Sequence, residues 1–164
     1  MNFITQLRML IFAGTLSLSL TACGDTETAQ TVPKPTTEKM DMKLEIQVGD
    51  RTLTSTLYDN ATAKDLIAQL PLTLTLTDYN GAEKIANPPK RLSTTGAPDG
   101  FEPKAGDIAY YAPWGNLAIF YRDFRHSQNL IRLGKIDGDN LEAFQGSGEV
   151  KVTFRMDKKS GESK

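Results

Sequence analysis

Cysteine and histidine each occur only once in this sequence of 164 residues. A single cysteine cannot form a disulfide framework within the chain, and it cannot supply the thiolate cluster of a structural zinc site. The one histidine, His126, has no partner at a metal-ligand spacing. We therefore expect packing and sheet hydrogen bonds to hold the fold together, without a metal or a cofactor.

An excess of basic charge is also absent, because 19 Lys and Arg are balanced by 20 Asp and Glu, for a formal net charge of −1. A surface that binds nucleic acid normally shows a basic excess or a basic stripe. The composition therefore predicts no nucleic-acid partner. The length predicts a single folded domain.

The longest apolar run covers Met9–Leu20, behind a short and weakly cationic start. It is too short to cross a bilayer comfortably, which needs roughly 20 apolar residues, but it has the length of a signal-peptide core. The run ends in Leu20-Thr21-Ala22-Cys23, which resembles the lipobox of bacterial lipoproteins. The resemblance implies cleavage before Cys23 and an anchor of several acyl chains on its thiol. The alternatives are an ordinary signal peptide with a chance cysteine, or an apolar core helix.

Four segments are predicted along the chain: a lipoprotein signal peptide at 1–22, a disordered tether at 23–41, a folded domain at 42–157 and a disordered tail at 158–164. The tether is rich in Thr, Pro and charge, with little to bury. These segments predict a lipid-anchored protein of the cell envelope, outside the cytoplasm. Gly24 stands where aspartate would signal retention at the inner membrane, which favours an outer membrane facing the periplasm if the host has one.

Apolar and polar residues alternate through most of the folded domain, as they do in strands. The predicted strands cover 44–48, 53–57, 72–77, 107–111, 117–121, 130–136 and 150–156. The turn Gly49-Asp50 joins the first two strands as a hairpin. One clear helix is predicted over Asp59–Leu70, because its apolar residues recur at helical spacing and Pro71 stops it. Thr62 and Asp65 have the spacing of a capping box at its start.

A short helical turn is predicted around Leu141 and Phe144, begun by Asp139 or Asn140. About seven strands with so little helix predict a closed or nearly closed barrel, because closure removes exposed sheet edges.

Three segments resemble the bacterial cyclophilin-like family. The central one is Gly106–Phe124, in which Pro-Trp-Gly-Asn precedes an apolar strand and Tyr-Arg. The segments Leu70–Ile85 and Asn129–Ile136 are similar to other parts of the family. The likeness covers residues 42–156 and implies a mainly β fold: a cyclophilin-like closed β-barrel with one clear α-helix and one short helix.

The prolyl isomerases of this fold use an arginine to polarise the prolyl amide nitrogen beside an apolar pocket. Their Phe-His-Arg signature is absent here, and Arg125-His126 stand in the reverse order. Arg122 or Arg132 remains a candidate for that role, because arginine stays charged and donates from a fixed fork. The alternative is that Arg122 pairs with Asp123 or Asp107 at a strand end. No catalytic residue is assigned.

Aromatic side chains crowd into residues 110–124. Such residues can fill a barrel, or they can line an apolar pocket with polar rims. The sequence Pro113-Trp114-Gly115-Asn116 is typical of a turn, which would leave the indole near the surface and favour binding. The predicted ligand-binding residues are Tyr111, Trp114, Asn116, Phe120 and Arg122.

Two other polar segments are interpreted as structural. The segment Tyr79–Lys84 is interpreted as a salt-bridged loop near a glycine turn. The segment Asp137–Glu142 lacks the third acidic position and the twelve-residue frame of a calcium loop, so a turn with a helix cap is favoured.

Three functions follow from these observations. The first is a membrane-anchored domain that binds a small apolar molecule or a peptide without robust catalysis. The second is an extracytoplasmic prolyl isomerase that assists the folding of secreted proteins. The third is a structural envelope lipoprotein, which a barrel packed solid around Tyr111 and Trp114 would favour.

Overall fold

The structure is a computed structural model that describes residues 39–157, with side chains described from residue 42 onward. The predicted signal peptide with Cys23, nearly all of the predicted tether and the predicted tail lie outside this range. Ten strands, one α-helix and one 3-10 turn occur within it. They are β1 (Lys39–Val48), β2 (Arg51–Tyr58), α1 (Ala61–Ile67), β3 (Leu72–Tyr79), β4 (Glu83–Ala86), β5 (Gly100–Phe101), β6 (Asp107–Tyr111), β7 (Asn116–Phe120), β8 (Ser127–Gln128), β9 (Leu130–Ile136), η1 (Glu142–Phe144) and β10 (Val150–Met156).

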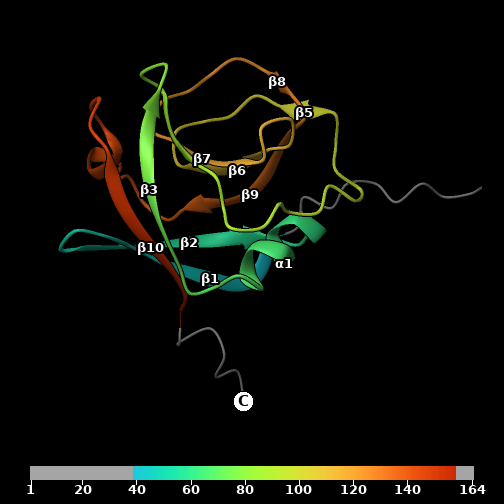
Figure 1. The fold of residues 1–164 in the computed structure, drawn as a ribbon, viewed down its shortest axis with the longest axis horizontal. Helices are drawn as coiled ribbons and strands as arrows, with labels where there is room; N and C mark the ends of the chain where they lie inside the picture. The colour runs from blue at the N-terminus through green and yellow to red at the C-terminus, as the bar shows by residue number, and fades with distance from the viewer. Residues whose placement is uncertain (1–38, 158–164) are drawn as a thin grey trace, which may run out of the picture. The chain divides into compact units, whose positions relative to one another are not determined.

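Eight of these strands close into an antiparallel barrel in the order β1-β10-β3-β4-β7-β6-β9-β2 (Figure 1). The strands β5 and β8 pair separately as a small two-stranded sheet. The predicted mainly β, closed barrel is therefore confirmed. The predicted number of strands is wrong, because β4, β5 and β8 are short and show no clear alternation of apolar residues.

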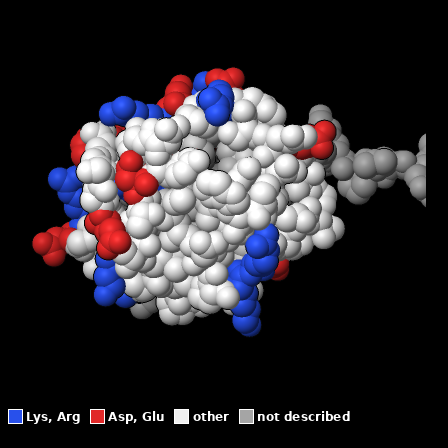
Figure 2. All heavy atoms as spheres, turned by 45° about the horizontal axis from the view of Figure 1, so that its top comes forward, with Lys and Arg blue, Asp and Glu red and all other residues white. Residues whose placement is uncertain are grey.

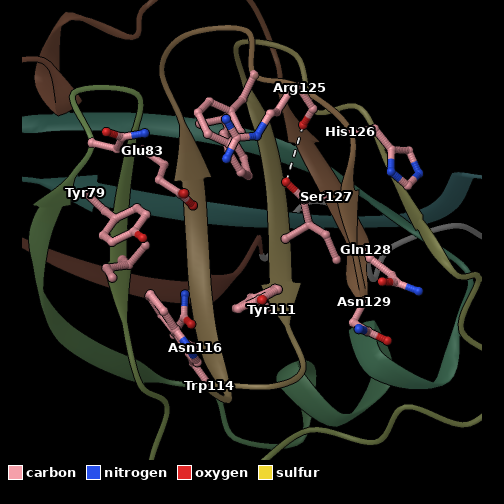
Figure 3. A pocket seen from close by; sticks show the side chains of 15 residues that line it. Tyr79, Glu83, Tyr111, Trp114, Asn116, Arg125, His126, Ser127, Gln128 and Asn129 are labelled. Atoms are coloured by element: carbon pink, nitrogen blue, oxygen red, sulfur yellow. Dashed lines mark hydrogen bonds between the residues drawn. The ribbon is translucent and has the colours of Figure 1, made fainter.

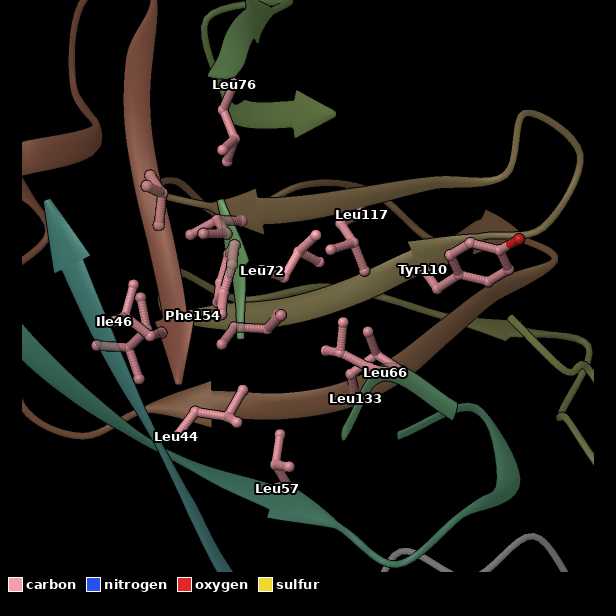
Figure 4. Packing of buried hydrophobic residues seen from close by; sticks show 14 of the residues in the cluster. Leu44, Ile46, Leu57, Leu66, Leu72, Leu76, Tyr110, Leu117, Leu133 and Phe154 are labelled. Atoms are coloured by element: carbon pink, nitrogen blue, oxygen red, sulfur yellow. The ribbon is translucent and has the colours of Figure 1, made fainter. Parts of the chain in front are cut away.

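The core fills the inside of the barrel with one face of each strand (Figure 4). In β3, Leu72 and Leu76 are buried, whereas Thr73 and Thr75 face solvent. This alternation follows from the two-residue period of a strand, which places successive side chains on opposite faces. The same period continues to the end of β3 and leaves Tyr79 exposed on the outside.

The helix α1 packs Ala63 and Leu66 into this core, and both side chains are fully buried. Its N-cap is Asn60, whose side-chain oxygen accepts a hydrogen bond from the Ala63 amide at 2.9 Å. The helix also ends at Ile67, before the predicted Leu70. No helix within residues 39–157 is long and apolar enough to span a membrane.

The predicted capping box of Thr62 and Asp65 is wrong, because both side chains bind a neighbouring loop instead. The Thr62 hydroxyl donates to the Ser93 carbonyl at 2.7 Å, and the Asp65 carboxylate accepts from the Ser93 amide at 2.7 Å. These two bonds tie the loop before β5 to the helix.

The predicted N-terminal hairpin is confirmed by the pairing of β1 with β2 around a turn at Gly49. The first strand begins at Lys39, which is earlier than the predicted domain boundary at residue 42. The predicted helical turn is present as η1, with Phe144 fully buried, but its N-cap is Leu141 rather than Asp139 or Asn140.

Candidate functional site

A cavity of about 340 Å³ lies on the outer face of the barrel wall formed by β4, β7 and β6 (Figure 3). The register of the sheet explains which side chains reach it. Glu83 of β4 lies between Tyr79 of β3 and Phe120 of β7, and Tyr111 of β6 pairs with Asn116 of β7. These five residues project outward because they share one parity along their strands.

The centre of this wall carries small side chains. Ala109 and Ala118 are paired across β6 and β7 on the same outer face, and both are fully buried. They belong to a second apolar cluster that lies outside the barrel core and includes Phe120 and Leu130. The two alanines themselves do not line the cavity, whereas Phe120, Leu130 and Ile85 of this cluster do.

One corner of the cavity is built from three aromatic rings. Trp114 meets Tyr79 edge to face, with ring centroids 5.4 Å apart and planes at 89°. It meets Tyr111 in the same way at 5.5 Å and 81°. Trp114 is 52% exposed and Tyr79 is 39% exposed, so the rings are large apolar groups held at the surface. Exposed aromatic side chains beside a cavity are typical of binding sites.

The turn that carries Trp114 is fixed from behind. The Asn87 side-chain amide donates to the carbonyls of Trp114 and Gly115, both at 3.1 Å. Arg91 donates to the Ala112 carbonyl at 2.6 Å. Gly115 has φ +72°, and a Cβ added there would lie 2.8 Å from the Arg91 guanidinium. The turn therefore needs glycine, and it holds the indole in a defined place.

The carboxylate of Glu83 is the acidic group of the cavity, and burial alone raises its pKa to about 7. Among residues 42–157 it has no hydrogen bond and no ion pair. Desolvation favours the protonated form of a carboxyl group, and an opposite charge would reverse that effect. The cavity therefore holds a carboxyl group that titrates near neutral pH and has no partner.

Asn116 supplies a second unpaired polar group. Its side chain is almost fully buried, and its amide nitrogen donates to the Leu117 carbonyl at 3.2 Å. Its oxygen, Oδ1, is buried and accepts no hydrogen bond within the described part of the chain. An unsatisfied buried acceptor costs about 1–3 kcal/mol.

The opposite wall of the cavity is polar and comes from the segment 124–130, which includes Arg125, His126 and Gln128 (Figure 3). Backbone contacts hold this segment in place. The Phe124 amide donates to the Pro103 carbonyl at 3.0 Å, and the Asn129 amide donates to the Asp99 carbonyl at 2.8 Å. The Arg125 guanidinium lies over the Phe124 ring at 5.2 Å.

The charged residues on the face around these elements lie mainly near its margins. Figure 2, which turns the top of Figure 1 toward the viewer, shows a broad central surface without Lys, Arg, Asp or Glu. A surface with so little basic charge does not favour a polyanion.

The family profile that matches this chain is described as the cyclophilin-like family, and it covers residues 46–155. The chain belongs to the cyclophilin-like family. Among solved structures, the solution structure of the hypothetical protein AF2241 from Archaeoglobus fulgidus is similar, with a TM-score of 0.50 and 17% identity over 75% of this chain and 98% of that chain. This likeness supports the fold. No curated protein matches in sequence.

In this cyclophilin-like domain, four of the five predicted ligand-binding residues lie together in the cavity: Tyr111, Trp114, Asn116 and Phe120. The fifth, Arg122, is exposed and does not line it. The amides of both Tyr121 and Arg122 donate to the Ala82 carbonyl, at 3.0 and 3.2 Å, so the chain leaves the regular alternation where β7 ends. Tyr121 then enters the core, and the Arg122 guanidinium lies 5.9 Å from the centre of its ring.

The alternative prediction, that Arg122 pairs with Asp123 or Asp107, is also wrong. Asp123 pairs with Lys104 at 3.4 Å, and Asp107 pairs with Arg132 at 3.4 Å. Arg132, the other arginine considered for an isomerase role, lies over the Phe101 ring at 4.2 Å.

Sequence reasoning missed the other residues that line the cavity, among them Tyr79, Glu83, Arg125 and His126. The interpretation of Tyr79–Lys84 as a salt-bridged loop is wrong in two respects. Glu83 and Lys84 lie in strand β4, and Lys84 pairs with Asp78 at 3.3 Å rather than with Glu83. The sequence of β4 gives no alternation of apolar residues that would place Glu83 on the outer face.

Lys84 is fully buried on the inner side of β4. Its ammonium donates to the carbonyls of Gly146 and Gly148, the latter at 2.7 Å. Asp78 accepts a hydrogen bond from the Tyr121 hydroxyl, and this bond is the largest cause of its lowered pKa. Burial, followed by this bond, raises the pKa of Tyr121 to about 12. The network joins β3, β4, β7 and the loop before β10.

The segment Asp137–Glu142 does not gather ligands for calcium. Asp137 accepts from the Thr56 hydroxyl at 2.8 Å and pairs with Lys43 at 3.1 Å. Within residues 39–157 no group of three His, Cys, Asp or Glu side chains is arranged to hold a metal ion.

Proposed function

We propose that this protein is a membrane-anchored lipoprotein whose cyclophilin-like domain binds a small ligand or a peptide segment in the outer-face cavity, without robust catalysis. The observation that carries the proposal is the cavity beside Trp114, with its three edge-to-face rings. A volume near 340 Å³ lies at the small end of the range typical of ligand pockets. The unpaired Glu83 carboxylate supplies a polar group that would fix a ligand's orientation.

Trp114 provides the test, because it is the only tryptophan of the chain. We expect its fluorescence to change saturably when the full chain is titrated with a small apolar probe or a short Xaa-Pro peptide. The Trp114 signal of a Phe120→Ala variant should respond with weaker affinity. A signal that stays constant with both probes, and with extracts of the native membrane, would contradict the proposed binding.

The anchoring part of the proposal rests on the sequence around Cys23. We expect mass spectrometry of the native N-terminus to find a lipid-modified Cys23 as the first residue. A Cys23→Ala variant should leave the membrane fraction. A native protein that begins at Met1 with an unmodified thiol would contradict the anchor, the envelope location and the predicted tether together.

Prolyl isomerisation is the second candidate, and one observation favours it. The cavity contains Arg125 beside the aromatic side chains of Phe120 and Phe124, which is an arginine next to an apolar wall. The reaction must overcome a barrier of about 18–20 kcal/mol. A protease-coupled assay on a short Xaa-Pro peptide should show the uncatalysed rate. If isomerisation is accelerated, and the acceleration is lost in Arg125→Ala but kept in Arg122→Ala, the domain is a prolyl isomerase rather than only a binding domain.

A further inference from the structure

Two tyrosine rings meet the indole of Trp114 edge to face at the corner of the cavity. The planes of Tyr79 and Tyr111 each lie nearly perpendicular to the plane of Trp114. An aromatic face attracts a cation through its quadrupole, and a group of such faces is a recognised way to bind quaternary ammonium ions. Neither Lys nor Arg of the described residues lies over any of these three rings, so the faces are not already used by a cation of the chain.

The acidic group of the cavity stands next to this corner. Glu83 is paired in register with Tyr79, and its carboxylate points into the cavity on the same side (Figure 3). It has no counterion among residues 42–157. A half-buried carboxylate without a partner is costly, and a bound cation offsets that cost.

The positive group of the cavity does not neutralise this carboxylate. Arg125 is occupied over the Phe124 ring at 5.2 Å, and it forms no ion pair with Glu83. Burial raises the pKa of Glu83, as expected for a carboxyl group without an ion-pair partner. The end of the cavity with the three rings is therefore both aromatic and acidic.

We propose that this end of the cavity binds a small organic ammonium ion, held by the Glu83 carboxylate and the rings of Tyr79, Trp114 and Tyr111. This inference rests on the proposed function and names the ligand class. The cavity volume suits a small headgroup with a short substituent.

The test compares choline with 3,3-dimethylbutan-1-ol, its neutral isostere, by calorimetric titration of the full chain at pH 8. We expect choline to bind at least tenfold more tightly than the isostere. Glu83→Gln should remove this preference, whereas Glu142→Gln, at an exposed glutamate outside the cavity, should keep it. Trp114→Ala should lose choline binding, and Trp114→Phe should keep most of it, with circular dichroism confirming that each variant is folded.

Every other outcome contradicts either the ammonium proposal or the proposed ligand binding. Equal affinity for choline and its isostere would overturn the ammonium proposal and leave ligand binding in place. The same conclusion follows if choline does not bind but an apolar probe or an Xaa-Pro peptide does. Choline binding that Glu83→Gln leaves unchanged would place the cation elsewhere and overturn the proposal. Failure of every probe, including the apolar ones, would contradict the proposed function itself.

Discussion

Glu83 and Lys84 are neighbours in β4, yet their charged groups lie on opposite sides of the barrel wall. Lys84 is fully buried on the inner side, 3.3 Å from Asp78. Glu83 faces the outer cavity, where no described residue pairs with it. Successive side chains of a strand point to opposite faces, so the two residues have different surroundings and different roles. Lys84 stabilises the fold, and Glu83 is available to a ligand.

The buried pair predicts a large loss of stability when it is broken. Lys84→Met leaves two loop carbonyls without their donor and the Asp78 carboxylate without its counterion. Removing one partner of a buried ion pair costs about 3 kcal/mol or more. Denaturant unfolding should show that loss, whereas Lys104→Met, at an exposed lysine with two surface ion pairs, should leave the free energy of unfolding nearly unchanged. A loss below about 1 kcal/mol for Lys84→Met would contradict the role of the network.

The raised pKa of Glu83 predicts how stability varies with pH. The folded state holds a proton on Glu83 up to about pH 7, whereas the unfolded chain releases it near pH 4.5. The folded state therefore binds more protons between these values, and stability falls as pH rises through this window. The loss attributable to Glu83 is about 2 kcal/mol, after allowance for its partial contact with water.

Denaturation midpoints measured from pH 5 to pH 8 check this prediction. Glu83→Gln should be more stable than the parent chain at pH 8 and should lack the decline over this window. Asp78 and Asp137 have lowered pKa values, so their contribution is lost only in acid, near and below pH 4, and does not obscure it. A parent chain whose stability is flat from pH 5 to pH 8 would show that Glu83 is fully solvated.

The same carboxyl group predicts a pH-dependent affinity for choline. Affinity should rise about tenfold between pH 6 and pH 8, as Glu83 becomes ionised. The other groups that face the cavity are the titratable side chains of Tyr79, Tyr111 and His126 and the charged Arg125. A rise that survives in Glu83→Gln and disappears in His126→Ala would assign the dependence to the histidine.

The glycine of the Trp114 turn predicts a local effect on the site. Gly115→Ala strains a backbone at φ +72° and places a methyl group against Arg91. Gly49→Ala is a matched control, because that residue also has positive φ but has open space around it. Both variants should lose about 1 kcal/mol from the backbone conformation. Only Gly115→Ala should change the near-ultraviolet circular dichroism of Trp114. An unchanged signal would mean that this turn does not position the indole.

The sequence predicted the barrel because its long strands carry clear alternation, as in β3 and β10. It did not predict β4, because a charged pair within four residues gives no apolar period and Lys84 is buried only through partners distant in sequence. It placed Arg122 in the site because alternation was extended past Phe120, where the double hydrogen bond to the Ala82 carbonyl ends the regular strand. Arg125 lines the cavity because of the path that the segment 124–130 takes, and no local sequence pattern predicts that path.

The central claim is that the outer-face cavity at Trp114 is a ligand site, and the indole N–H resonance of the full chain tests it most directly. One tryptophan gives one such resonance. Titration with choline at pH 8 is predicted to shift this resonance saturably, with a dissociation constant equal to the calorimetric one. If calorimetry or fluorescence detects binding of choline or another probe while the indole resonance stays fixed at saturation, the ligand binds elsewhere and the account is wrong.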